Sequence, residues 1–80
     1  MTATWRCPVC GFDGLAGPPF DELGLPSFET CPTCGIQFGS VDSRKDVRHV
    51  VYRAWSERWL ANGRRPLSPP PTLDDLLGGE

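Results

Sequence analysis

Several features that define common protein classes are missing from this 80-residue chain. No apolar run approaches the ~20 residues that span a membrane, so we expect no membrane segment. Residues 1–4 lead into a cysteine motif without an apolar signal segment, and we therefore expect a cytoplasmic protein in a reducing compartment. The chain has one histidine, His49, no phosphate-cradling glycine loop and no Ser/His/Asp set, so we expect that it is not an enzyme.

The four cysteines of the chain form two copies of one motif. CPVCG occupies residues 7–11 and CPTCG occupies residues 31–35, with 20 residues between the two CxxC pairs. In each motif the proline restricts the turn and the glycine accepts a positive φ, so both thiolates can hold one ion. Two such motifs predict a tetrahedral four-sulfur site. The predicted ligands of one Zn²⁺, or of iron as the alternative, are Cys7, Cys10, Cys31 and Cys34.

Two other uses of paired cysteines fit the chain less well. A pair of disulfides suits a secreted miniprotein, but nothing before Cys7 resembles a signal segment. A thioredoxin-type redox pair needs one CxxC on a βαβ scaffold rather than two motifs in a short chain. A metal would also compensate for the small size of the domain. A body of about 60 residues buries too little surface to be more than marginally stable without a cross-link such as a metal site. We therefore expect the metal to be a condition of folding.

The pattern of residues divides one small domain into three regions. Residues 1–42 hold both cysteine motifs and many turn residues, which predicts a four-cysteine, zinc-ribbon-like region with short β-hairpins. Residues 43–63 predict an amphipathic helix packed on that region. Residues 64–80 form a proline-rich acidic tail that we expect to be flexible, with a capped helical turn at residues 72–77 as the alternative. The predicted fold class is a small metal-stabilised α+β domain.

The helix has recognisable start and stop signals. Ser43 with Asp46 resembles a capping box, and Asn62 followed by Gly63 is a typical stop. One face carries an apolar stripe of Val47, Val50, Val51, Ala54 and Trp55. The aromatic residues that this stripe is expected to contact are Trp5, Phe12, Phe28 or Phe38.

Three helix residues do not belong to the simple stripe and form a possible partner surface. Tyr52 and Trp59 lie on one flank, where they either extend the core or form an exposed aromatic patch of the kind that marks interfaces. Arg58 lies near the middle of the apolar face, so it either binds a partner or packs its stem and pairs its guanidinium within the chain. The candidate acidic partners of that guanidinium are Asp21, Glu22 and Glu29.

The motifs resemble those of two known groups of proteins. The cysteine motifs, the PPFDELGLPSFE segment at residues 18–29 and the YRAWSERWLANG segment at residues 52–63 resemble a family of small uncharacterised bacterial proteins of the cysteine-rich CPCC and zinc-ribbon kind. The second motif has Pro-Thr-Cys where that family has Pro-Cys-Cys. This resemblance implies a metal-stabilised fold and no particular activity. The paired motifs, with Trp5 before and Phe12 after the first, also resemble rubredoxins, which implies iron-based electron transfer, although the spacer and the long helix differ.

Three functions follow from these features. The leading prediction is a structural zinc-binding protein that acts as a protein-interaction or adaptor module for an unidentified protein partner. A rubredoxin-like electron-transfer protein and a nucleic-acid-binding zinc ribbon are the alternatives. The last depends on an uneven charge distribution, because residues 1–39 carry one basic and four acidic side chains. The basic residues lie further along, at Arg44, Lys45, Arg48, Arg53, Arg58, Arg64 and Arg65.

Overall fold

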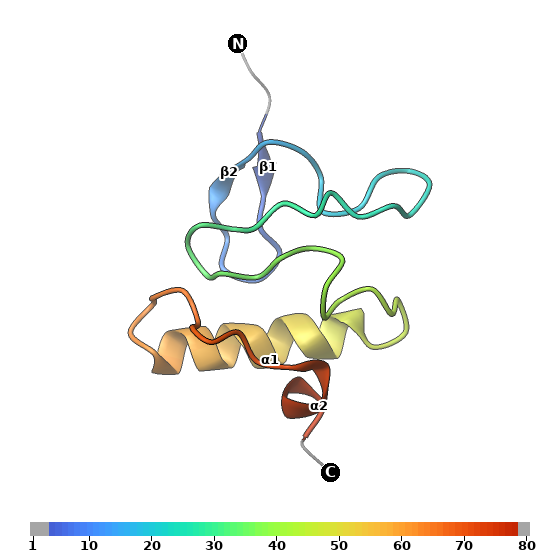
Figure 1. The fold of residues 1–80 in the computed structure, drawn as a ribbon. Coiled ribbons are helices and arrows are strands. Elements are labelled where there is room, and N and C mark those ends of the chain that lie inside the picture. The colour runs from blue at the N-terminus through green and yellow to red at the C-terminus, as the bar shows by residue number, and fades with distance from the viewer. Residues whose placement is uncertain (1–3, 79–80) are drawn as a thin grey trace.

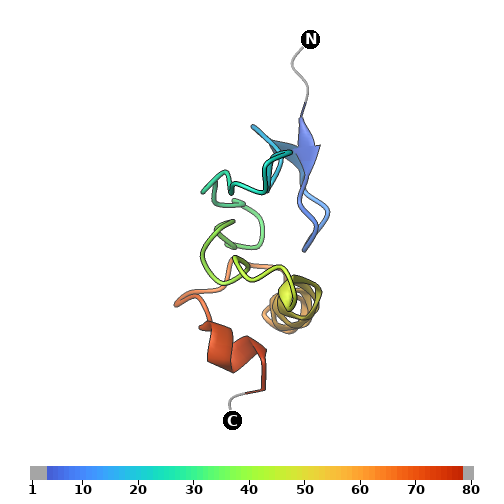
Figure 2. The same ribbon diagram turned by 90° about the vertical axis from the view of Figure 1, so that its right-hand side faces the viewer.

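The computed structural model describes residues 4–78, and its elements lie in successive layers (Figures 1 and 2). The elements are β1 (Trp5–Arg6), β2 (Asp13–Leu15), α1 (Arg48–Ala61) and α2 (Leu73–Leu76). The β1–β2 hairpin lies at one end, the loop of the second cysteine motif follows, and α1 and then α2 lie beyond it. This is a small α+β fold, as predicted. Residues 1–3 and 79–80, the ends of the predicted first region and of the tail, lie outside the described residues.

The N-terminal hairpin is built around the first cysteine motif. β1 and β2 pair in antiparallel fashion, with Trp5 opposite Leu15 and an irregular register after Trp5. The pairing continues into the motif, since the Cys7 backbone N–H donates to the Phe12 carbonyl at 2.8 Å. Leu15 is fully buried, so the hairpin contributes its inner face to the core.

The segment between the motifs is held by carboxylates. The Glu29 carboxylate accepts the backbone N–H of Ala16 at 2.9 Å. The Asp21 carboxylate accepts the N–H groups of Leu23 and Leu25, both at 2.9 Å, and so closes the tip of the loop. These bonds give a turn-rich segment a defined shape without ladder pairing.

Of the short β-hairpins predicted in residues 1–42, the one beside the second cysteine motif is reduced to a single bridge between Thr30 and Gln37. The reason is local, because Phe28 has a φ of 58°, which an extended strand does not accommodate. The bridge still brings the second cysteine motif into a small hairpin-like loop.

The predicted start of the helix at Ser43 is wrong, because α1 begins at Arg48 with Val47 as its N-cap. Val47 makes no side-chain cap. The predicted capping box does not form, since the Asp46 carboxylate pairs with the Arg44 guanidinium at 2.9 Å instead. Residues ahead of α1 form turns, and a buried group explains why the helix starts late.

That buried group is Asp42, which is fully buried and holds the chain in a turn. Its carboxylate accepts the Gly39 N–H at 2.6 Å and the Tyr52 hydroxyl at 2.7 Å. Its carbonyl accepts Arg48 Nε at 2.8 Å, while the Arg48 guanidinium lies 3.6 Å over the Phe20 ring. Burial and the hydrogen bond to this carboxylate raise the pKa of Tyr52 above its usual range. The network ties the start of α1 to the loop between the motifs.

The predicted helix stop is confirmed. Gly63 has a φ of 73°, and its N–H donates to the Leu60 carbonyl at 3.2 Å. The N–H of Arg64 donates to the Trp59 carbonyl at 2.9 Å. These two bonds form a Schellman motif, in which the glycine supplies the left-handed conformation that reverses the chain.

The core is small and centred on the cysteines. Its buried apolar residues are Cys7, Val9, Leu15, Cys31, Cys34, Ile36, Phe38, Val51, Trp55, Trp59 and Leu76. Of the aromatic contacts predicted for the helix, Phe38 is fully buried, whereas Trp5 and Phe28 are exposed. The helix is also rotated relative to the predicted stripe, because Val50 is exposed and Trp59 is buried. A smallest dimension of 17 Å leaves little interior beyond this set.

The tail has the second of its two expected forms, a capped helical turn docked on the same chain. Thr72 and Asp75 form a capping box that starts α2. Leu76 is buried, and Arg58 donates to the Asp75 carbonyl at 2.8 Å. Within the described residues, no helix has the length and apolar character that crossing a membrane requires.

The Asp42 network predicts an unequal effect of two similar substitutions. Asp42→Ala should lower the free energy of unfolding by about 2–4 kcal/mol, because it leaves a part-buried amide and a part-buried hydroxyl without their acceptor. Asp46→Ala should change it by less than about 0.5 kcal/mol, since its ion pair is exposed. Urea unfolding of the metal-loaded protein, followed by tryptophan fluorescence, measures both, and equal effects would contradict the assigned role of Asp42.

Candidate metal centre

The two cysteine motifs fold into turns of the same shape. In each turn the carbonyl of the first cysteine accepts the N–H of the final glycine at 2.9 Å, Gly11 to Cys7 and Gly35 to Cys31. The two glycines have φ values of 83° and 85°, as the motif predicts. The Val9 N–H points at the Cys7 sulfur, 3.4 Å away. The repeated motif therefore gives a repeated local structure.

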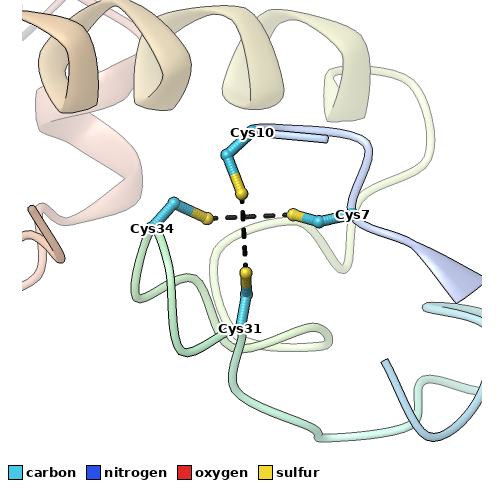
Figure 3. A group of neighbouring side chains, drawn as sticks. All are labelled: Cys7, Cys10, Cys31 and Cys34. Atoms are coloured by element: carbon cyan, nitrogen blue, oxygen red, sulfur yellow. Dashed lines mark hydrogen bonds between the residues drawn. The ribbon is translucent and has the colours of Figure 1, made fainter. Parts of the chain in front are cut away.

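The turns face each other and bring all four sulfurs together (Figure 3). The four Sγ atoms lie within 4.8 Å of one another. The sulfurs of Cys7 and Cys34 are 3.8 Å apart, and those of Cys10 and Cys31 are 3.6 Å apart. Each close pair joins one turn to the other, and the two pairs cross in Figure 3 as opposite edges of a tetrahedron do.

These separations fit a metal ion. Zinc–sulfur bonds of about 2.3 Å in a tetrahedron give sulfur–sulfur edges of roughly 3.8 Å. A disulfide requires about 2.05 Å, which is much shorter than either close pair. Four thiolates in this arrangement suit zinc or iron, so the cluster is compatible with metal binding. The ligand roles of the four residues stay a prediction.

The site is closed to solvent on most sides. Cys7, Cys31 and Cys34 are buried, and Cys10 is partly buried. Two grooves flank the tail, with volumes of about 420 and 550 Å³, and neither is lined by a cysteine.

Crowding of the sulfurs controls their protonation. The hydrogen bond from the Cys34 thiol lowers the pKa of Cys7 to about 5. The same bond and burial raise the pKa of Cys34 above its usual range. Burial raises the pKa of Cys10 to about 11. Cys10 and Cys34 therefore carry protons at neutral pH, and four adjacent thiolates need a cation to neutralise them.

The second turn has additional supports that the sequence reasoning missed. Trp55 Nε1 donates to the Cys34 carbonyl at 2.9 Å, and Trp59 Nε1 donates to the Thr33 carbonyl at 2.8 Å. The Leu67 N–H also donates to the Cys34 carbonyl, at 3.3 Å. The available signal was the spacing of two tryptophans on one helix face, since a buried indole N–H needs an acceptor.

The three residues of the possible partner surface all make contacts within the chain. Trp59 is only 8% exposed. Tyr52 is half-buried and donates to the Asp42 carboxylate. Arg58 is exposed, but its guanidinium bonds to the carbonyl of Asp75 rather than to the acidic side chains considered from the sequence. Of the three, Trp59 bonds to the second cysteine turn, at the Thr33 carbonyl. The role of the three toward a partner stays a prediction.

Fold and site together define a small α+β chain with a four-cysteine cluster compatible with metal binding. The chain is similar to the protein YozI of Bacillus subtilis strain 168, with 24% identity over 92 aligned positions that cover 100% of this chain and 76% of the relative. It is also similar to YoaQ of the same organism, with 26% identity over 87 positions that cover 94% and 73%. Both relatives are uncharacterized proteins. No model of a protein family matches the chain, and no solved structure matches it.

The protonation of the sulfurs predicts the pH dependence of metal binding. Because the metal displaces protons from Cys10 and Cys34, zinc binding near neutral pH should release protons. Affinity should fall as the pH falls, and more steeply below about 5, where Cys7 also becomes protonated. Calorimetric titrations in buffers of different protonation enthalpy measure the released protons. Binding heats that do not depend on the buffer would contradict the prediction.

Proposed function

We propose that this chain is a zinc-binding protein of the zinc-ribbon kind, in which four cysteine thiolates hold one structural Zn²⁺. The observation that supports the proposal is the set of sulfur separations, 3.6 and 3.8 Å for the close pairs and at most 4.8 Å overall. The separations of the two close pairs agree with the edges of a zinc–thiolate tetrahedron. When bound, the ion would neutralise the thiolates and hold the two turns together.

The size of the core supports a structural role for the ion. Cysteines account for three of the eleven buried apolar residues of the described chain, so much of its interior is the site itself. A chain this small is marginal without a staple. Structural zinc supplies on the order of 10 kcal/mol of folding free energy in small domains. The ion would therefore be the main stabilising contact between the hairpin and the rest of the molecule.

Catalysis is not part of this proposal. A catalytic zinc keeps one coordination position open, and four thiolates fill all positions of a tetrahedral ion. The neighbouring grooves also lack cysteines. Free thiolates of this kind persist in a reducing compartment, so the proposed location is the cytoplasm.

The first test of the proposal is the metal that the protein carries. Untagged protein from cells supplied with zinc and iron should contain one zinc per chain and show no visible absorption band. Cys34→Ser should lower the zinc content sharply, whereas Thr33→Ser, a conservative change at the neighbouring position of the same turn, should retain it. Protein without metal would contradict the site. One iron with a sulfur-to-iron charge-transfer band would instead favour rubredoxin-like electron transfer.

Protein interaction is a second candidate function, and the loop between the motifs favours it. Leu23, Leu25 and Phe28 are 83%, 58% and 61% exposed. The Asp21 carboxylate holds the tip of this loop in a defined shape, so the apolar side chains are presented without a large loss of entropy on binding. We propose that this loop, rather than the Tyr52 side of α1, contacts a protein partner.

Nucleic acid is the less favoured partner. Two of the three arginines of α1, Arg48 and Arg58, already bond to carbonyls within the chain. The remaining positive charge is offset by an acidic N-terminal half. A surface that binds phosphates concentrates free positive charge on one face.

A comparison of exposed leucines tests the interaction surface. Leu23→Ser combined with Leu25→Ser should abolish recovery of a partner that co-purifies with the wild-type chain, with little change in stability because both side chains are exposed. Leu60→Ser is the matched control, since Leu60 is 51% exposed on α1. Quantitative affinity purification from the native host measures recovery. Loss with the control but not with the loop variant would assign the contact to α1.

A further inference from the structure

The two cysteine turns share one backbone design but are supported unequally. The second turn, residues 31–35, receives hydrogen bonds from three groups outside the motif, the indoles of Trp55 and Trp59 and the N–H of Leu67. All three go to the carbonyls of Thr33 and Cys34. In the described part of the chain, the first turn, residues 7–11, receives no side-chain hydrogen bond from either helix.

The indole bonds are difficult to break. Trp55 is 1% exposed and Trp59 is 8% exposed, so an indole N–H that left its carbonyl would have little water to replace it. A buried donor without an acceptor costs more than the net gain from forming the bond. α1 therefore fixes the position of the Thr33 and Cys34 carbonyls, and with them the backbone that carries the Cys34 sulfur.

The first turn depends on weaker attachments. Its hairpin has two short strands and is joined to the later part of the loop by hydrogen bonds from the N–H groups of Ala16, which is exposed, and Gly17, which is part-buried, to the Glu29 carboxylate. Short strands with exposed bonds open at low free energy. Figures 1 and 2 show β1 and β2 on the side away from α1, whereas the turn between them extends toward α1.

We propose that Trp55 and Trp59 are positioning residues of the metal centre, which act through the carbonyls of the second turn. This inference depends on the proposed zinc function and deepens it. The second turn is the rigid half of the site, and the first turn is the half that opens when metal is exchanged. The partial exposure of Cys10, the one member of the cluster that is not fully buried, agrees with an opening on that side.

The experiment replaces each indole by benzothienylalanine in synthetic full-length chains. This side chain keeps the two-ring shape and lacks the N–H, so a loss that follows it belongs to the hydrogen bond rather than to packing. Zinc affinity, measured by competition with a chromophoric chelator, should fall roughly tenfold for the replacement at Trp55 or Trp59. The same replacement at Trp5, on β1, is the control and should leave affinity unchanged.

Amide hydrogen exchange of the zinc-loaded protein supplies a second readout. Gly11 and Gly35 donate equivalent hydrogen bonds of 2.9 Å in the two turns. In the wild type we expect the Gly35 amide to exchange about tenfold more slowly than the Gly11 amide, and we expect the indole replacements to reduce this difference. A purely packing role for the tryptophans would leave the difference intact when the ring shape is kept.

The outcomes separate the inference from the proposed function. A wild-type chain that binds no zinc contradicts the proposed function itself. A wild-type chain that binds zinc, with replacements at residues 55 and 59 that bind as tightly as the control at residue 5, overturns only the positioning role. Equal exchange of the two glycine amides in the wild type overturns the assignment of a rigid and an opening half.

Discussion

Four sulfur atoms within 4.8 Å of one another impose the constraint on which the rest of the structure depends. Without a cation they cannot all be thiolates, because each negative charge raises the cost of the next. The pKa of Cys7 is lowered and the pKa of Cys34 is raised, because one sulfur of this close pair holds its proton while the other carries the charge. A bound cation would turn that repulsion into the strongest contact between two halves of the chain. Such a contact would explain how the chain folds with so few other buried residues.

The parts predicted well from the sequence are those encoded by local chemistry. The CPxCG motifs have their proline and glycine at positions that shape a turn, and both turns form with the expected positive φ at the glycines. The stop at Asn62 and Gly63 is equally local. The clustering of four cysteines followed from motif spacing, because two such turns in a chain this short have few other uses.

The parts that were missed depend on contacts between distant residues. Ser43 and Asp46 fit a capping box locally, but Asp42 is drawn inward by Gly39 and Tyr52, and the helix starts later as a result. The hydropathy pattern also did not predict how α1 is rotated about its own axis. Its orientation brings two indole N–H groups to acceptors that lie 21 and 26 residues earlier in the chain. No periodicity within the helix contains that information.

The indole bonds change how α1 should be understood. A helix beside a small metal site is readily interpreted as a surface for partners, and its aromatic residues favour that view. Here the indoles of Trp55 and Trp59 bond to the backbone of the second cysteine turn, so the helix supports that turn and its apolar side is occupied. The most exposed large apolar residues lie instead on the loop that the Asp21 carboxylate shapes. The helix therefore stabilises the second cysteine turn, whereas the loop leaves its apolar side chains free to interact.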